Sequence, residues 1–345
     1  MPNASGSLPG SQPQGEPAME AMLLELEERR RAGDAASLAD ACMRLAQAYA
    51  ARGSFRRALT TYEEALKAFE ERDDRAGRLL CLKSMAGLAY REGAWSRALD
   101  LYHQALALLA DPEERAEMAL THSQIGSVYQ GQGDWDNALA AYRKSLEIRD
   151  ELGDTRGMAL LYNNMGAVRA RQERWDEARE AWSKCLSLHE GTGDLSGQAI
   201  TLGNLGSLAQ RQGRWADALA WYERSVSAYR KSGDSLGEAT IWNNVGFVHK
   251  QLGQLDRALA AYRAALTRLQ EMGDTLRATV AVYNMAVVHE DQGNYREALR
   301  LLTQVIELDR RIGHPDLRRD MEAFRRIRQK LDADRDAKRM QEERG

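Results

Sequence analysis

The sequence contains few of the residues that interrupt helices or cross-link loops. Only 6 of its 345 residues are proline and only 3 are cysteine. So few prolines leave nearly the whole chain free to be helical, which predicts an all-α protein. Cys42, Cys81 and Cys185 are far apart, fit no metal-ligand spacing and are odd in number, so neither a zinc site nor a closed disulfide framework is expected. We interpret them as small apolar core residues.

The chain also lacks a dominant charge and a long apolar segment. Its 48 basic and 51 acidic residues give a net charge of −3, which creates no strong field to attract nucleic acid or an anionic membrane. No stretch approaches the ~20 apolar residues that a membrane span needs. The start of the chain lacks the basic residues and apolar run of a secretory signal. We therefore expect a cytoplasmic protein that binds no nucleic acid and inserts into no membrane.

A forty-residue repeat runs along most of the chain. Seven alanines share this spacing: Ala58, Ala98, Ala138, Ala178, Ala218, Ala258 and Ala298. A bulky residue stands three positions before each alanine and another stands four positions after it, such as Trp135 and Tyr142. A small residue such as Gly126 recurs upstream. Small residues opposite large ones allow two helices to approach closely, so each repeat is expected to be a pair of packed helices.

Turn residues separate the helical stretches. Glycine divides the two helices in six of the seven repeats, with Glu173 as the exception. The dipeptide Gly-Asp then joins repeats at 153–154, 193–194, 233–234 and 273–274. Glycine can adopt the left-handed conformation that ends a helix, and aspartate can cap the next one. The hairpins are therefore expected to join directly.

This pattern resembles the tetratricopeptide repeat, as in the run NNMGAV…RWDEAREAW at 163–182. The 40-residue period and the Gly-Asp junction are most similar to the branch found in kinesin light chains, Pins-type spindle-orientation adaptors and bacterial Rap-type peptide sensors. The resemblance implies a right-handed α-solenoid, or superhelix, of antiparallel helical hairpins over about residues 35–314. It also implies a partner that is a protein or a peptide.

The repeat divides the chain into consecutive segments. A stacked array must cover its terminal apolar faces, so an extra helix is expected at each end. The predicted segments are a disordered leader at 1–17, a half-repeat helix at 18–34, repeats at 35–74, 75–114, 115–154, 155–194, 195–234, 235–274 and 275–314, a capping helix at 315–331, and a charged tail at 332–345.

No catalytic, cofactor or metal site is expected. The 6 histidines have no second histidine or cysteine at the spacing of a zinc site. The acidic residues of the tail match the spacing of a calcium loop, but Ala337 stands where that loop requires glycine. The sequence therefore favours a protein that is not an enzyme.

A ladder of asparagines points to a binding function. Asn164, Asn204, Asn244 and Asn284 lie at 40-residue steps, and Gln124 lies at the same position of an earlier repeat. Asparagine is about 0.5 kcal/mol worse than alanine inside a helix. Its amide can bond both the C=O and the N–H of an extended chain, and in the resembled families this position contacts the ligand backbone. We predict a peptide-binding groove that also includes Asn163 and Asn243.

Basic residues are expected on the same inner surface. They are Arg91, Arg171, Arg211 and Lys250, and they favour an acidic ligand. Three other interpretations stay open. The ladder could be a relic of duplication, the array could be a scaffold that self-associates, or the protein could be a regulatory peptide sensor that acts through a partner.

Overall fold

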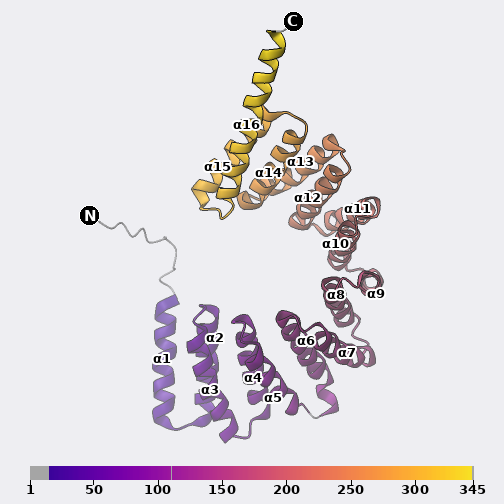
Figure 1. Ribbon diagram of the computed structural model, residues 1–345. Coiled ribbons are helices and arrows are strands. Elements are labelled where there is room, and N and C mark those ends of the chain that lie inside the picture. Colours follow the sequence, from indigo (N-terminus) through magenta and orange to yellow (C-terminus); the bar gives the residue numbers. More distant parts are fainter. Residues whose placement is uncertain (1–14, 110, 344–345) are drawn as a thin grey trace, which may run out of the picture. The chain divides into compact units, whose positions relative to one another are not determined.

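The computed structural model describes residues 15–109 and 111–343, which form helices and short turns (Figure 1). The chain divides into two compact units, residues 1–154 and 155–345. The first unit contains α1 (Gly15–Ala32), α2 (Ala35–Ala51), α3 (Phe55–Glu71), α4 (Arg75–Arg91), α5 (Trp95–Ala107), a 3₁₀ turn (Pro112–Glu114), α6 (Arg115–Gln132) and α7 (Trp135–Glu151). The second contains α8 (Thr155–Arg171), α9 (Trp175–Thr192), α10 (Leu195–Arg211), α11 (Trp215–Ser232), α12 (Ser235–Gln251), α13 (Leu255–Glu271), α14 (Thr275–Asp291), α15 (Tyr295–Ile312) and α16 (Leu317–Glu342).

Consecutive helices form antiparallel pairs. In each repeat an A helix is followed by a tight turn and a B helix. The A helices are α2, α4 and α6 in the first unit and α8, α10, α12 and α14 in the second. Within each unit every helix contacts the next one along the chain. The prediction of an all-α fold made of antiparallel helical hairpins is therefore confirmed.

The small and large residues of the repeat meet at the A–B interface, as predicted. The seven alanines that are spaced by 40 are fully buried. A Cβ atom added to Gly126 would lie 2.6 Å from the ring of Tyr142, and one added to Gly206 would lie 2.6 Å from Tyr222. These distances are shorter than any normal carbon contact, so the rings rest directly on the backbone of the A helix. The missing side chain is what lets the two helices come so close.

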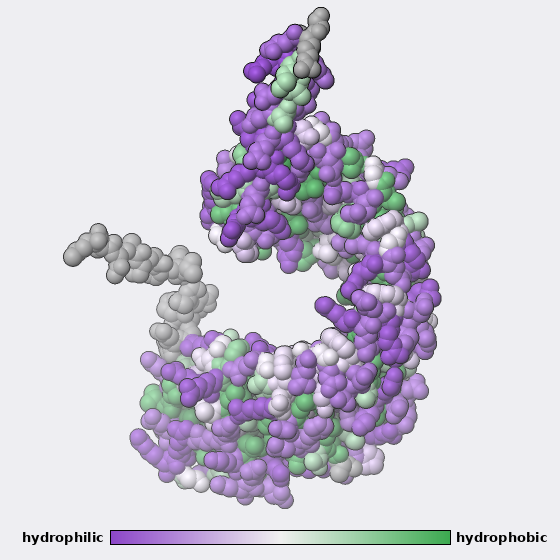
Figure 2. Space-filling model, in the orientation of Figure 1, coloured by the Kyte–Doolittle hydropathy of each residue, from purple (hydrophilic) through white to green (hydrophobic). Residues whose placement is uncertain are grey.

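Each unit has its own apolar core between its helices. Leu45 and Tyr62 are buried in the first unit, while Val248 and Leu302 are buried in the second. In the view of Figure 2 the surface of both units is mostly hydrophilic. None of the described helices combines the length and apolar character that crossing a bilayer would require.

The turns follow the predicted chemistry. Gly193 and Gly233 have φ of 69° and 77° and end α9 and α11. Asp234 caps α12 by accepting a hydrogen bond from the N–H of Gly237 at 2.8 Å. Glu173, the residue that replaces glycine between α8 and α9, adopts a positive φ of 59°. The backbone of that turn is therefore the same as in the other repeats, and only the residue differs.

The cysteines occupy the core as small apolar residues, as predicted. Cys42, Cys81 and Cys185 are buried and carry free thiols. The Sγ of Cys81 donates to the carbonyl oxygen of Tyr62 at 3.0 Å. Burial raises the pKa of the Cys42 and Cys81 thiols to about 12, so both stay protonated and unreactive at neutral pH.

Extra helices flank the hairpins within the described residues. Met19 and Leu26 of α1 are buried in the core of the first unit, and Ile327 of α16 is buried in the second. Helix α16 continues past the predicted end at residue 331 as far as Glu342. Ion pairs one turn apart, such as Lys338 with Asp334 at 2.9 Å, support this extension. Residues 1–14 of the predicted leader lie outside the described residues.

Candidate functional site

The predicted asparagines lie near the middle of the A helices. Asn164, Asn204, Asn244 and Asn284 are on α8, α10, α12 and α14 of the second unit and are all half-buried. Gln124 is at the equivalent position of α6 in the first unit and is also half-buried. The Oε1 atom of Gln124 is buried and has no hydrogen-bond partner among the described residues. These amides are thus partly covered by the protein and partly exposed.

Two of the ladder amides bond to the preceding repeat. The Nδ2 of Asn204 donates to the Oδ1 of Asn163 at 2.9 Å, and the Nδ2 of Asn284 donates to the Oδ1 of Asn243 at 3.4 Å. Asn163 also accepts from the indole nitrogen of Trp182 at 3.2 Å. Part of the ladder therefore holds neighbouring A helices together.

The other two asparagines have no such bond. The side chains of Asn164 and Asn244 form no hydrogen bond with the described part of the chain. The sequence explains why Asn244 lacks such a bond. In the repeat before it, Gly203 stands at the position that Asn163 and Asn243 occupy in their own repeats, and glycine has no side chain to accept a hydrogen bond. The Asn-Asn doublets at 163–164 and 243–244 were the signal for these contacts between repeats.

The predicted basic residues lie at or near the C-terminal ends of A helices. The guanidinium of Arg91 lies 4.8 Å from the centre of the Phe55 ring, and that of Arg211 lies 5.3 Å from the centre of a Trp175 ring. Both therefore pack on an aromatic residue of the preceding repeat, while a stacked guanidinium keeps its edge available for a carboxylate. Arg171 is exposed at the end of α8.

The fourth basic residue is already paired. The Nζ of Lys250 lies 3.4 Å from a carboxylate oxygen of Asp291 on the next A helix. Its positive charge is partly neutralised by that contact. The basic character predicted from the sequence is therefore weaker around α12 and α14 than the count of lysines and arginines suggests.

An exposed aliphatic ladder, which the sequence interpretation missed, runs beside the asparagines. Its members are between 40% and 54% exposed. They are Leu80, Leu120, Leu160, Ile200 and Val280. Leu120, Leu160, Ile200 and Val280 each precede a ladder amide by four residues, and Leu80 precedes Ser84, which stands at the same repeat position. Each therefore lies on the same face of its A helix, one turn earlier. The 40-residue spacing itself would have revealed them, because large aliphatic residues recur there although the position is exposed.

Three of the predicted residues meet in one hollow of the second unit. It has a volume of about 440 Å³ and lies between α12 and α14, with α13 below. Its lining includes Asn243, Asn244 and Asn284 from the predicted site. Phe247 and Val280 supply apolar surface. The structure thus brings these three amides together, while Asn163, Asn164 and Asn204 lie on α8 and α10.

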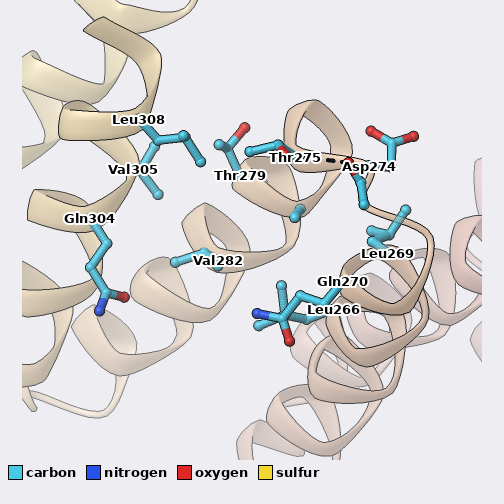
Figure 3. Close-up of a pocket in the computed structure, with 12 residues that line it drawn as sticks. Leu266, Leu269, Gln270, Asp274, Thr275, Thr279, Val282, Gln304, Val305 and Leu308 are labelled. Carbon is cyan, nitrogen blue, oxygen red and sulfur yellow. Dashed lines mark hydrogen bonds between the residues drawn. The ribbon is translucent and has the colours of Figure 1, made fainter. Parts of the chain in front are cut away.

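A second hollow opens on the opposite side of α14 (Figure 3). It has a volume of about 270 Å³ and is lined by aliphatic side chains of α13, α14 and α15, among them Leu266, Val305 and Leu308. Ala278 and Val282 line it where other repeats have larger residues, such as Met118 and Trp242. The hollow exists because this repeat lacks those fillers.

The described residues hold no group of three or more histidine, cysteine or acidic side chains placed to bind a metal ion. The chemistry that the A-helix face offers is therefore hydrogen bonding by amides, apolar contact and a few cationic groups. Such a surface can bind a polypeptide.

Comparison with known proteins identifies the repeat. Models of the tetratricopeptide repeat match residues 41–76, 82–116 and 121–156 and residues 157–231, 197–271 and 237–311. None of the curated proteins matches this sequence.

Similar solved structures share the fold at low sequence identity. Aspartyl phosphate phosphatase F from Bacillus subtilis is 12% identical with a TM-score of 0.58, covering 85% of this chain and 72% of its own. The apo form of RapI is 18% identical with a TM-score of 0.56, covering 79% and 97%. A putative kinesin light chain from Podosopora anserina is 13% identical with a TM-score of 0.50, covering 58% and 98%.

Proposed function

Because the chain belongs to the tetratricopeptide repeat family, we propose that it is a non-enzymatic adaptor that binds an extended, acidic peptide segment of another protein. Tetratricopeptide repeats generally mediate protein–protein interaction. The proposed site is the exposed face of the A helices, with the asparagine ladder as its centre. A cytoplasmic location is part of the proposal.

The observation that carries this proposal is the state of the ladder amides. Asn164 and Asn244 leave their donors and acceptors unused by the described residues, although asparagine is an unfavourable residue inside a helix. Asn204 and Asn284 each use one donor internally and keep the carbonyl oxygen. An extended backbone offers both C=O and N–H groups, so it can satisfy amides of both kinds.

The neighbouring side chains would select the sequence of the ligand. In the second unit the exposed side chains of Leu160, Ile200 and Val280, one turn before the asparagines, can make apolar contacts with the ligand, and Thr240 stands at this position in the remaining repeat. Burying each aliphatic side chain would contribute about 25 cal/mol per Å². Arg91, Arg171 and Arg211 are exposed and can pair with acidic residues of the ligand. The proposed ligand therefore alternates apolar and acidic side chains along an extended chain.

The test uses a random twelve-residue peptide library displayed on phage and selected on the full chain. The peptide enriched most strongly is then titrated by fluorescence anisotropy against Asn164→Ala/Asn204→Ala/Asn244→Ala. Three lost amides at about 1 kcal/mol each should weaken binding tenfold or more.

Asn137→Ala is the matched control, because Asn137 is an exposed asparagine on a B helix. It should bind the peptide like the wild type, and circular dichroism should show both variants folded. Failure to enrich any peptide, or equal affinity of the triple variant, would overturn the proposal. Concentration-dependent assembly of the purified protein, measured by light scattering and unaffected by the triple variant, would instead favour the self-associating scaffold.

A further inference from the structure

The hollow between α12 and α14 is lined by a tyrosine whose hydroxyl has no hydrogen-bond partner among the described residues. Tyr262 of α13 is only 2% exposed and lines the hollow from below. No hydrogen bond joins its hydroxyl to any of the residues that the structure describes. The hydroxyl is therefore free to donate a hydrogen bond to an acceptor that a ligand brings into the hollow.

Two equivalent tyrosines, Tyr142 and Tyr222, are satisfied internally. The hydroxyl of Tyr142 donates to the Oε1 of Gln130 at 2.7 Å and lies 3.2 Å from the Oγ of Ser127. The hydroxyl of Tyr222 donates to the Oε1 of Gln210 at 2.9 Å. In both of these repeats the acceptor is a glutamine 12 positions before the tyrosine.

The repeat that contains Tyr262 has lost both of these acceptors. Phe247 stands where Ser127 stands, and Lys250 stands where Gln130 and Gln210 stand. A phenyl ring offers no oxygen, and a lysine ammonium can only donate. Lys250 is in addition paired with Asp291. The Tyr262 hydroxyl therefore faces the hollow with a proton and no acceptor.

The hollow offers several free donors, beside the unbonded carbonyl oxygens of Asn244 and Asn284. The Oε1 of Gln210 is bonded to Tyr222 and the Oδ1 of Asn243 is bonded to Asn284, so each amide keeps its NH₂ group for a guest. Arg277 also lines the hollow. Its guanidinium pairs with Asp274 but has five N–H donors, more than that contact uses. No acidic side chain is among the residues that line this hollow.

We infer that this hollow is the subsite that recognises an acidic side chain, aspartate or glutamate, of the bound peptide. A carboxylate only accepts hydrogen bonds, so it matches a site with donors from Tyr262, Gln210, Asn243 and Arg277. This inference rests on the proposed peptide-binding function and adds the residue class that one position of the peptide must carry. Burial raises the pKa of Tyr262 to about 12, which keeps the hydroxyl protonated as a donor at neutral pH.

The experiment compares the Tyr262→Phe and Tyr142→Phe variants of the full chain. Each variant is titrated with two peptides: the one enriched from the random twelve-residue library, and the same peptide with its aspartate or glutamate replaced by asparagine or glutamine. Tyr262→Phe removes a hydroxyl that has no internal bond, so it should leave thermal stability unchanged or higher but weaken the acidic peptide about tenfold. It should not weaken the amide peptide further. Tyr142→Phe removes a hydroxyl that is bonded internally, so it should lower stability and leave binding unchanged.

The outcomes separate this inference from the function on which it rests. Loss of the preference for the acidic peptide in Tyr262→Phe, but not in Tyr142→Phe, supports the subsite. Enriched peptides without an acidic residue overturn it. The subsite is also overturned if Tyr262→Phe binds the peptide like the wild type while Asn164→Ala/Asn204→Ala/Asn244→Ala has lost binding. That result would leave the proposed function intact. If the wild type enriches no peptide, both fail.

Discussion

A single residue type has two roles on the A helices. Asn163 and Asn243 accept hydrogen bonds from the next repeat, whereas Asn164 and Asn244, one position later, form none with the described residues. Successive helix positions are rotated by about 100°, so adjacent asparagines face different surroundings. The first asparagine of each doublet bonds to the next repeat, and the second leaves its amide unbonded within the described residues.

A buried pair of carboxyl groups lies where α15 meets α16. Asp309 and Asp320 are 0% and 2% exposed. His314 and Asp316 lie beside them, and Arg319 pairs with Asp320 at 3.1 Å and with Asp316 at 2.9 Å. Burial, followed by the neighbouring Asp320 carboxyl group, raises the pKa of Asp309 to about 6. The folded protein thus binds a proton at pH values where an unfolded aspartate has lost it.

We predict that Asp309→Asn stabilises the protein at pH 7.5 but much less at pH 4.5. Because the pKa of Asp309 is higher in the folded state than in the unfolded state, its contribution to the free energy of unfolding is fully present below about pH 4. That contribution is lost as the pH rises through 6. A neutral amide at position 309 avoids this loss of stability. A pKa difference of this size corresponds to roughly 1–3 kcal/mol. Urea unfolding of both proteins at the two pH values measures it. An equal difference at both would mean that Asp309 acts only through packing.

Adjacent repeats meet through a ring and a glycine. A Cβ atom added to Gly77, Gly197 or Gly237 would lie 2.2 Å from the ring of Phe69, His189 or Tyr229, respectively. These rings lie near the end of a B helix and the glycines near the start of the next A helix. Where the ring is replaced by Leu109 or Leu269, the glycine is replaced by Glu117 or Arg277. Glycine is thus present wherever the B helix carries a ring at this position, and Gly157, which pairs with Arg149, is the one case of the glycine without a ring.

We predict that Gly237→Ala destabilises the protein by about 1–3 kcal/mol, because the ring of Tyr229 must move. In a Tyr229→Leu background the same change should cost much less. A double-mutant cycle from urea unfolding measures this coupling.

Gly191→Ala is the matched control for this cycle. Gly191 lies within α9, and no atom lies within 4 Å of its added Cβ, so alanine there should be neutral or stabilising. Equal costs of Gly237→Ala with and without Tyr229 would show that the ring does not determine the need for glycine.

At the scale of the whole molecule, contacts follow the order of the chain. Within each unit every helix contacts its neighbours in sequence, and residues 1–154 and 155–345 form separate compact units with cores of their own. In such arrays stability is approximately the sum of repeat and nearest-neighbour terms. Either unit should therefore fold without the other.

We predict that fragments 1–154 and 155–345, expressed separately, are both helical and unfold cooperatively. Their circular dichroism spectra, weighted by length, should add up to the spectrum of the full chain. A fragment with the spectrum of an unfolded chain would show that its fold depends on the other unit. Thermal melts of each fragment and of the full chain complete the comparison.

The positions of the helices, turns and caps follow from the sequence alone. Ala138 and Tyr142 predict the close A–B contact, and the Gly-Asp step at 233–234 predicts the helix end and the cap that the structure shows. These features depend on helical periodicity and on steric limits within a few residues, so they can be read from spacing. The end of α16 was harder to predict, because charged residues such as Lys338 and Asp334 can remain helical through local ion pairs.

Only the tertiary structure decided which polar groups are satisfied. The sequence contains Asn204 and Asn163, but whether they meet depends on how two A helices stack, and the sequence spacing of 41 residues does not determine that geometry. The same holds for Tyr262, whose hydroxyl lacks an acceptor because Phe247 and Lys250 replace the groups that serve its equivalents. Repetition fixes where each residue recurs, whereas packing between helices fixes what each side chain touches.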